Sequence, residues 1–184
     1  METAHELFIH ELNDILDGEK RLVEALSEQE QDSSRPELKK AFAAHRAQTE
    51  KQIERLQQVF SDIGEQPEGT ECHGIKGLIE EKKAFQEEED PSEELIDIFN
   101  VGAAVKVESY EINSYQSLIR LAQLMGHRKA AQLLNQNLKE EQQTLKKMED
   151  LSKKLKPSEL GMGEEEEEAA PARGRSGRRG RRAA

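Results

Sequence analysis

The chain has 184 residues and a net charge of −11, and 35% of its residues are charged while tryptophan is absent. This length suits one domain with a modest core. No run approaches the roughly 20 apolar residues that a membrane span needs, and residues 1–25 are too acidic for a signal peptide, so we expect a cytoplasmic protein. The single cysteine, Cys72, excludes an internal disulfide and is interpreted as a small packed residue.

Apolar residues recur at intervals of three and four along most of the chain, which predicts helices. We expect four long helices, over about residues 5–29, 36–63, 92–125 and 128–155. Ser34 is the expected N-cap of the second helix, and Pro36 lies in its first turn. A shorter helix is expected over about residues 75–87, and Gly126 is the expected stop of the third long helix.

The connection between the second and third long helices decides the predicted topology. A link of about thirty residues can cross the length of a bundle, as in ferritin-like folds, whereas the other two links are tight turns. The predicted fold is therefore all-α: a ferritin-like antiparallel four-helix bundle over residues 1–156, with the extra short helix inside the long crossover.

Residues 157–184 lose the apolar periodicity and are predicted to form a disordered tail. Residues 164–168 are five consecutive glutamates, and the remainder is rich in arginine and glycine. The six arginines are Arg173, Arg175, Arg178, Arg179, Arg181 and Arg182. Without these five of 38 acidic and six of 27 basic side chains, the folded part has a net charge near −12 and should be repelled by nucleic acid and anionic membranes. The arginines could bind nucleic acid, or fold back on the acidic body.

Three glutamates interrupt the apolar stripes of their predicted helices. At about 100° per residue, a position on a helix face follows from spacing alone. Glu19 falls between Ile15 and Leu22, Glu108 falls between Val105 and Ile112, and Glu141 has an equivalent position in the fourth long helix. An isolated ionised carboxylate in a core is very costly, so these groups must be neutralised, paired or bound to metal.

The distances from the turns place these residues at one depth of the bundle. Residues equidistant from the turn of an antiparallel hairpin face each other, and Glu108 and Glu141 are nearly equidistant from the turn that joins their helices. In the first hairpin, the position of the second helix that is as far from the turn as Glu19 lies close to His45. We therefore expect His45, Glu19, Glu108 and Glu141 to converge on one layer, with Glu111 beside them at the edge of its helix face.

Four glutamates and one histidine supply the oxygen and nitrogen ligands that suit iron or manganese, and carboxylates can bridge two cations. We predict an iron or manganese site with the ligands Glu19, His45, Glu108, Glu111 and Glu141. Thr144 and Gln48 stand three residues after two of these ligands, a spacing that bundle-core metal sites use. Tyr115 lies either near the metals or simply in the core.

The alternative interpretation of this set is purely structural. Wide helix faces often include a glutamate at their edge, and arginine or lysine can neutralise it. His45 could equally be a core histidine whose ring is hydrogen-bonded.

Three segments resemble the bacterial YciF-like family of ferritin-like stress proteins: PELKKAFAAHRAQTEKQIERLQQVF, CHGIKGLIEE and KVESYEINSYQSLIRLAQLMGHRKAAQLL. The resemblance covers roughly residues 5–155. It implies a four-helix bundle with an extra short helix, a homodimer, a link to stress responses and a dinuclear metal site of the rubrerythrin type. Its members commonly have glutamate at the position of Gln48, so helix two is poorer in acids here, and Glu50 is a candidate substitute from the flank.

Two functions are compatible with these features. The first is a dimetal carboxylate protein that binds iron or manganese and reacts with oxygen or peroxide, with a ferroxidase- or peroxidase-like activity. The second is a non-catalytic helical interaction protein whose arginine-rich tail binds nucleic acid.

Overall fold

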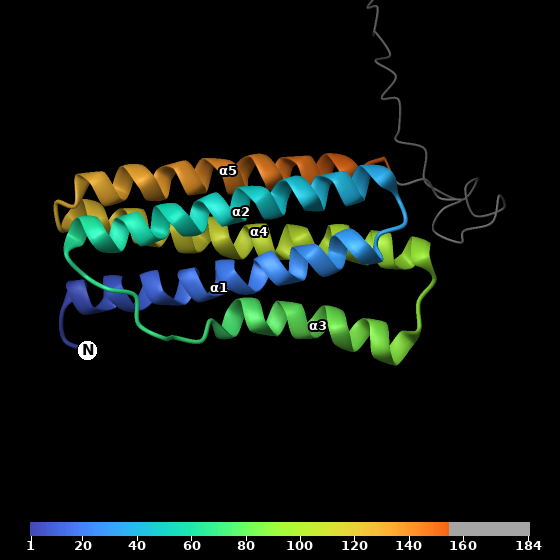
Figure 1. Cartoon of the computed structure of the whole chain (residues 1–184), viewed down its shortest axis with the longest axis horizontal. Coiled ribbons are helices and arrows are strands. Elements are labelled where there is room, and N and C mark those ends of the chain that lie inside the picture. Colours follow the sequence, from blue (N-terminus) through green and yellow to red (C-terminus); the bar gives the residue numbers. More distant parts are fainter. Residues whose placement is uncertain (155–184) are drawn as a thin grey trace, which may run out of the picture. The chain divides into compact units, whose positions relative to one another are not determined.

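The computed structural model describes residues 1–154, and every regular element in this range is an α-helix (Figure 1). The helices are α1 (Ala4–Asp32), α2 (Pro36–Ile63), α3 (His73–Glu89), α4 (Glu93–Leu124) and α5 (Arg128–Ser152). All five predicted helices are confirmed, with ends that shift by about three residues or fewer. Within residues 1–154, no helix is long and apolar enough to cross a membrane. The predicted tail, with its acidic run and its six arginines, lies outside the described residues.

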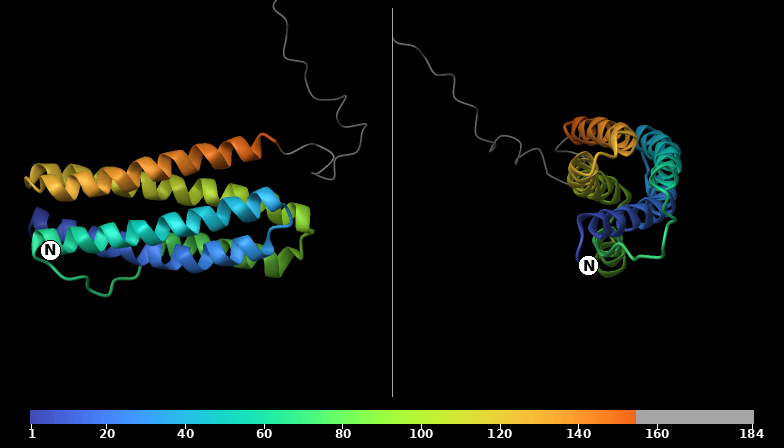
Figure 2. Two further views of the ribbon diagram at one scale, coloured as in Figure 1. Left: turned by 45° about the horizontal axis from the view of Figure 1, so that its top comes forward. Right: turned by 90° about the vertical axis from the view of Figure 1, so that its left-hand side faces the viewer.

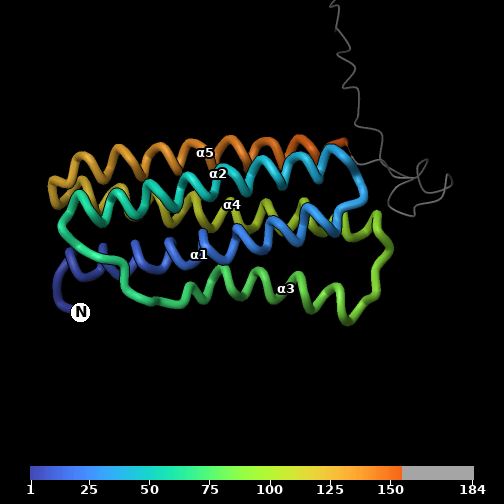
Figure 3. Tube along the Cα trace, in the orientation of Figure 1, coloured from blue at the N-terminus to red at the C-terminus, as the bar shows by residue number. Residues whose placement is uncertain are grey.

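The four long helices form two hairpins, α1–α2 and α4–α5, which pack with α1 against α4 and α2 against α5. Figure 2 shows this arrangement along and across the helix axes. The link after α2 contains α3, which runs back along α1 and α4, so that α4 starts at the same end of the bundle as α2 (Figure 3). Every pair of neighbouring long helices is therefore antiparallel, which confirms the ferritin-like bundle with its long crossover.

Two apolar clusters fill the bundle, one on each side of the level of Glu19. The first includes Phe8, Leu56 and Leu134, and it lies toward the end where α4 turns into α5. The second includes Leu22, Phe42, Val101 and Met148, and it lies toward the turn between α1 and α2. On each long helix the candidate ligands fall between members of the two clusters, so apolar side chains close the layer from both ends.

The start of α2 corrects one prediction. Arg35, not Ser34, is the N-cap residue, and its side chain makes no capping hydrogen bond. The Ser34 hydroxyl instead donates to Asp97 of α4 at 2.7 Å, and the same carboxylate accepts the backbone N–H groups of Ser34 at 2.9 Å and Arg35 at 3.2 Å. A buried carboxylate from a distant helix thus binds the two residues just before α2, where its negative charge also suits the N-terminal end of a helix.

The extra helix α3 is held to the bundle through its first turn. Cys72, its N-cap residue, is fully buried, as the sequence predicted, and its thiol donates to Asp14 at 3.2 Å. Tyr110 of α4 donates to the same carboxylate at 3.2 Å. Gly74 lies directly against the Tyr110 ring: a Cβ atom there would be 2.6 Å from Cζ and 2.7 Å from the hydroxyl oxygen. Only glycine leaves room for this contact.

The substitution Gly74→Ala is expected to lower the free energy of unfolding by about 1–3 kcal/mol, because the added methyl group must displace the Tyr110 ring. Gly77→Ala is the matched control in the same helix, since a Cβ atom there meets nothing within 4 Å. It should raise stability by about 0.5–1 kcal/mol through better helix propensity. Urea unfolding measures both, and equal stabilities of the two variants would contradict this account of how α3 is attached.

Candidate metal centre

All five residues predicted as ligands lie together in one layer of the bundle. Glu19 comes from α1, His45 from α2, Glu108 and Glu111 from α4, and Glu141 from α5, and each is at most 4% exposed. Counting residues from the turns of the two hairpins therefore predicted that these residues lie at one depth of the bundle. Glu111 differs in one respect, because it is 1% exposed and lies inside the core rather than at the edge of its face.

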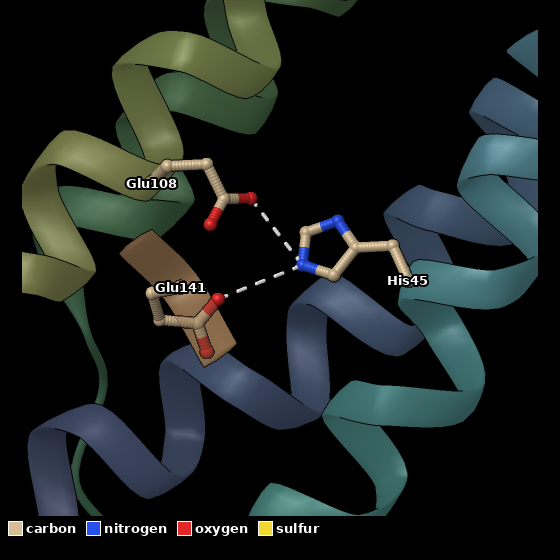
Figure 4. Close-up of side chains that lie close together, drawn as sticks. All are labelled: His45, Glu108 and Glu141. Atoms are coloured by element: carbon tan, nitrogen blue, oxygen red, sulfur yellow. Dashed lines mark ion pairs between the residues drawn. The ribbon is translucent and has the colours of Figure 1, made fainter. Parts of the chain in front are cut away.

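The ligand atoms form two groups that share Glu141. One group contains His45, Glu108 and Glu141, and the other contains Glu19, Glu111 and Glu141. Within each group the nearest ligand atoms all lie within 4.8 Å of one another. His45 Nε2 is 3.3 Å from Glu108 Oε1 and 3.8 Å from Glu141 Oε2 (Figure 4). One carboxylate between two groups of donors is the arrangement that lets two cations share a bridging ligand.

The acidic face of α4 is rotated relative to the apolar stripe that the sequence indicated. Val105 and Ile112 were expected at the centre of the buried face, but both are only half-buried. The fully buried line instead passes through Ala104, Glu108 and Glu111. Glu108 and Glu111 are thus more deeply buried than Val105 and Ile112.

A second set of polar residues holds the ligands. Gln52 Nε2 donates to Glu141, and the Tyr115 hydroxyl donates to Glu19. Asn137 Nδ2 donates to the Tyr115 hydroxyl at 3.0 Å and to the backbone oxygen of Gln52 at 3.3 Å. These three side chains are fully buried. Tyr115 was a candidate from the sequence, whereas Gln52 and Asn137 were missed.

A positional signal for the two missed residues exists in the sequence. Gln52 follows His45 by seven residues and Asn137 precedes Glu141 by four, so each lies on the same helix face as a ligand. Both are neutral amides in otherwise buried positions. Such residues are hydrogen-bonded when they are buried, and that requirement could have marked them as neighbours of the centre.

The other candidate neighbours on α2 and α5 differ in their burial. Thr144 is buried and lies one turn after Glu141 on α5. Gln48 is half-buried and Glu50 is exposed. Glu50 therefore does not replace the acid that the family resemblance leads one to expect on α2, because its side chain faces water.

Burial controls the protonation of the centre. It raises the pKa of Glu19, Glu108 and Glu111 well above the usual 4.5, and repulsion between the carboxylates adds to this effect. Burial also raises the pKa of Glu141 to about 7 and lowers the pKa of His45 to about 4. The imidazole is therefore neutral at neutral pH, with a lone pair available, and the carboxyls bind protons when no other cation neutralises them.

The unpaired atoms of the layer point to a cation. Seven buried atoms of the five candidate ligands have no hydrogen-bond partner within residues 1–154. They are Glu19 Oε2, His45 Nδ1 and Nε2, Glu108 Oε1 and Oε2, Glu111 Oε1 and Glu141 Oε2. Buried polar atoms are nearly always paired, so seven such atoms in one layer form a donor set that a cation could satisfy. Oxygen and imidazole nitrogen donors fit iron or manganese.

The fold and this layer define a ferritin-like bundle with a buried carboxylate centre, and comparisons with known proteins agree on the family. A family model described as "Domain of unknown function (DUF892)" matches residues 3–161. The chain is also 40% identical to protein YciF of Escherichia coli (strain K12) over 153 residues. This alignment covers 83% of this chain and 92% of that protein. The chain belongs to the DUF892 family, and its resemblance to YciF is confirmed.

Solved structures show the same architecture. The crystal structure of the E. coli stress protein YciF superposes with a TM-score of 0.78 at 40% identity, over 83% of this chain and 96% of that one. YcfI from Rhodopseudomonas palustris superposes with a TM-score of 0.77 at 34% identity, over 80% of this chain and 94% of that one. A Xanthomonas campestris pv. campestris protein at 18% identity, with a TM-score of 0.68 over 86% of this chain and 96% of that one, shares the fold.

The metal-free protein is expected to lose stability as the pH rises from about 6.5 to 8.5. The buried glutamates have raised pKa values in the folded state, so their protonated forms favour folding below pH 4.5, and this contribution is lost as the pH rises through the folded pKa values. His45 opposes this trend only below its unfolded pKa of 6.5, which is why the comparison starts there. Thermal unfolding at several pH values, in the presence of a chelator, measures the slope.

Two substitutions test whether the layer causes this slope. Glu111→Gln removes one buried titrating group and should flatten the slope, whereas Glu50→Gln changes an exposed residue of α2 and should not. A slope that is the same in the wild type and in both variants would show that the buried layer does not determine the pH dependence.

Proposed function

We propose that this protein is a ferritin-like dimetal carboxylate protein that holds two iron or manganese ions in its buried layer and acts in bacterial stress responses. The observation that carries the proposal is the set of seven unpaired ligand atoms on two groups that share Glu141. The description of the similar E. coli YciF as a stress protein supports the physiological part. The homodimer, the cytoplasmic location and nucleic-acid binding by the tail stay predictions of the sequence.

Each residue has a distinct role in this proposal. His45 and Glu108 would hold one cation, Glu19 and Glu111 would hold the other, and Glu141 would contact both. The set departs from the usual bundle-core arrangement, in which two helices each provide a Glu-x-x-His pair. Here α4 provides Glu108 and Glu111, and His45 is the only nitrogen donor among the two groups.

The chain's own residues prepare this layer for a redox-active cation. Iron or manganese bound there would supply one-electron chemistry toward oxygen or peroxide. Apolar clusters on both sides exclude bulk water. Gln52 and Tyr115 each hold one oxygen of a ligand, which fixes the direction in which the other oxygen points. His45 stays neutral because burial lowers its pKa, so it can bind a cation without first losing a proton.

Anaerobic loading with Fe(II), followed by desalting and elemental analysis, tests the proposal. The wild type should retain two ions per chain, and Glu108→Ala/Glu141→Ala should lose most of this metal because each group then lacks at least one ligand. Glu50→Ala/Glu149→Ala is the matched control, since both glutamates are exposed. Circular dichroism checks that each variant is helical. The proposal is wrong if the first double variant retains as much iron as the wild type.

A further inference from the structure

Two of the five candidate ligands accept hydrogen bonds from side chains outside the two groups. Glu19 accepts from Tyr115, and Glu141 accepts from Gln52. Neither ring nitrogen of His45 and neither carboxyl oxygen of Glu108 has a hydrogen-bond partner among the described residues. Among the ligands that belong to one group only, Glu19 is therefore the one that another side chain holds, because Glu111 Oε1 has no hydrogen-bond partner and His45 Nε2 lies near Glu108 and Glu141 of its own group. We call the group that contains Glu19 the held group.

The held side is anchored as far as the protein surface. Arg55 Nη1 donates to Asn137 Oδ1 at 2.8 Å, and the Arg55 guanidinium binds both carboxylate oxygens of Glu140 at 2.7 and 2.8 Å. Asn137 in turn donates to the Tyr115 hydroxyl. A continuous chain of hydrogen bonds thus runs from a half-buried ion pair between α2 and α5, through Asn137 and Tyr115, to Glu19 on α1. This chain crosses three helix interfaces and restrains the Glu19 carboxylate.

Both charge and order favour the held group as the first to bind a cation. It offers three carboxylates, whereas the other group offers two carboxylates and a neutral imidazole, and Glu141 belongs to both groups. Ligands that are already held in place lose less conformational freedom when an ion binds, so less of the binding free energy is spent on ordering them. An all-oxygen donor set also suits manganese, while imidazole suits iron and zinc.

We propose that the two groups form unequal subsites. The subsite of Glu19, Glu111 and Glu141 binds a hard divalent cation such as Mn(II) first and tightly, with Tyr115 as the positioning residue of Glu19. The subsite of His45, Glu108 and Glu141 fills second and exchanges its ion more readily. This inference rests on the proposed function, because it assigns an order and a preference to the same centre.

The test uses the full chain and Mn(II) alone. Equilibrium dialysis, with free Mn(II) counted by electron paramagnetic resonance, should resolve two classes of sites whose dissociation constants differ by about ten-fold or more. Tyr115→Phe removes one hydroxyl and should weaken the first class by about 10–100-fold while the second class keeps its affinity. His45→Ala should abolish the second class and leave the first.

Tyr110→Phe is the matched control, because this is the other tyrosine of the chain and its hydroxyl donates to Asp14 outside both groups. It should leave both classes unchanged. A purely structural role of Tyr115 would weaken both classes together, so the difference between the classes is the decisive measurement.

Three results would each overturn the inference. The wild type could bind both Mn(II) ions with equal affinity, or Tyr115→Phe could weaken both classes of sites equally. The third is loss of the tight class in His45→Ala. All three results leave the dimetal function intact, since two ions still bind in the wild type. If circular dichroism shows that Tyr115→Phe does not fold, the comparison of His45→Ala with the wild type still tests whether the two subsites are unequal. Failure of the wild type to retain either Mn(II) or Fe(II) would instead overturn the proposed function itself.

Discussion

Four carboxyl groups and one imidazole are removed from water in a single layer of this bundle, and the remaining structure depends on that desolvation. An ionised carboxylate in a core is costly unless it is paired, protonated or bound to a cation. Burial accordingly raises the pKa of every glutamate in the layer and lowers the pKa of His45. The apolar clusters on both sides supply the favourable burial that offsets this cost.

Contacts outside the two groups of candidate ligands link the helices that build the layer. Asp97 of α4 accepts hydrogen bonds from Ser34 and Arg35 just before α2, and these bonds link the two hairpins at one end of the bundle. Cys72 and Tyr110 share Asp14, which ties α3 to both α1 and α4. The crossover is therefore attached to α1 through Cys72, and the same carboxylate of α1 also binds α4 through Tyr110.

The depth of the candidate ligands could be predicted from the sequence, whereas their exact facing could not. Depth follows from counting residues to a turn, because a helix rises by a constant amount per residue. Facing depends on how each helix rotates against its neighbours. Val105 and Ile112 appeared to mark the buried face of α4, but packing turned the helix so that Glu111 became fully buried. Glu50 failed as a substitute ligand for the same reason, since its side chain faces water.

The sequence by itself determined the helices, the long crossover and the set of five candidate ligands, because periodicity, breakers and distances from turns are local properties of the chain. Only the tertiary structure decided which groups hold those ligands. Gln52, Asn137 and Arg55 join the centre through contacts between residues more than eighty positions apart. The hydrogen bonds between Ser34 and Asp97 have the same origin, since the two residues are 63 positions apart in the chain.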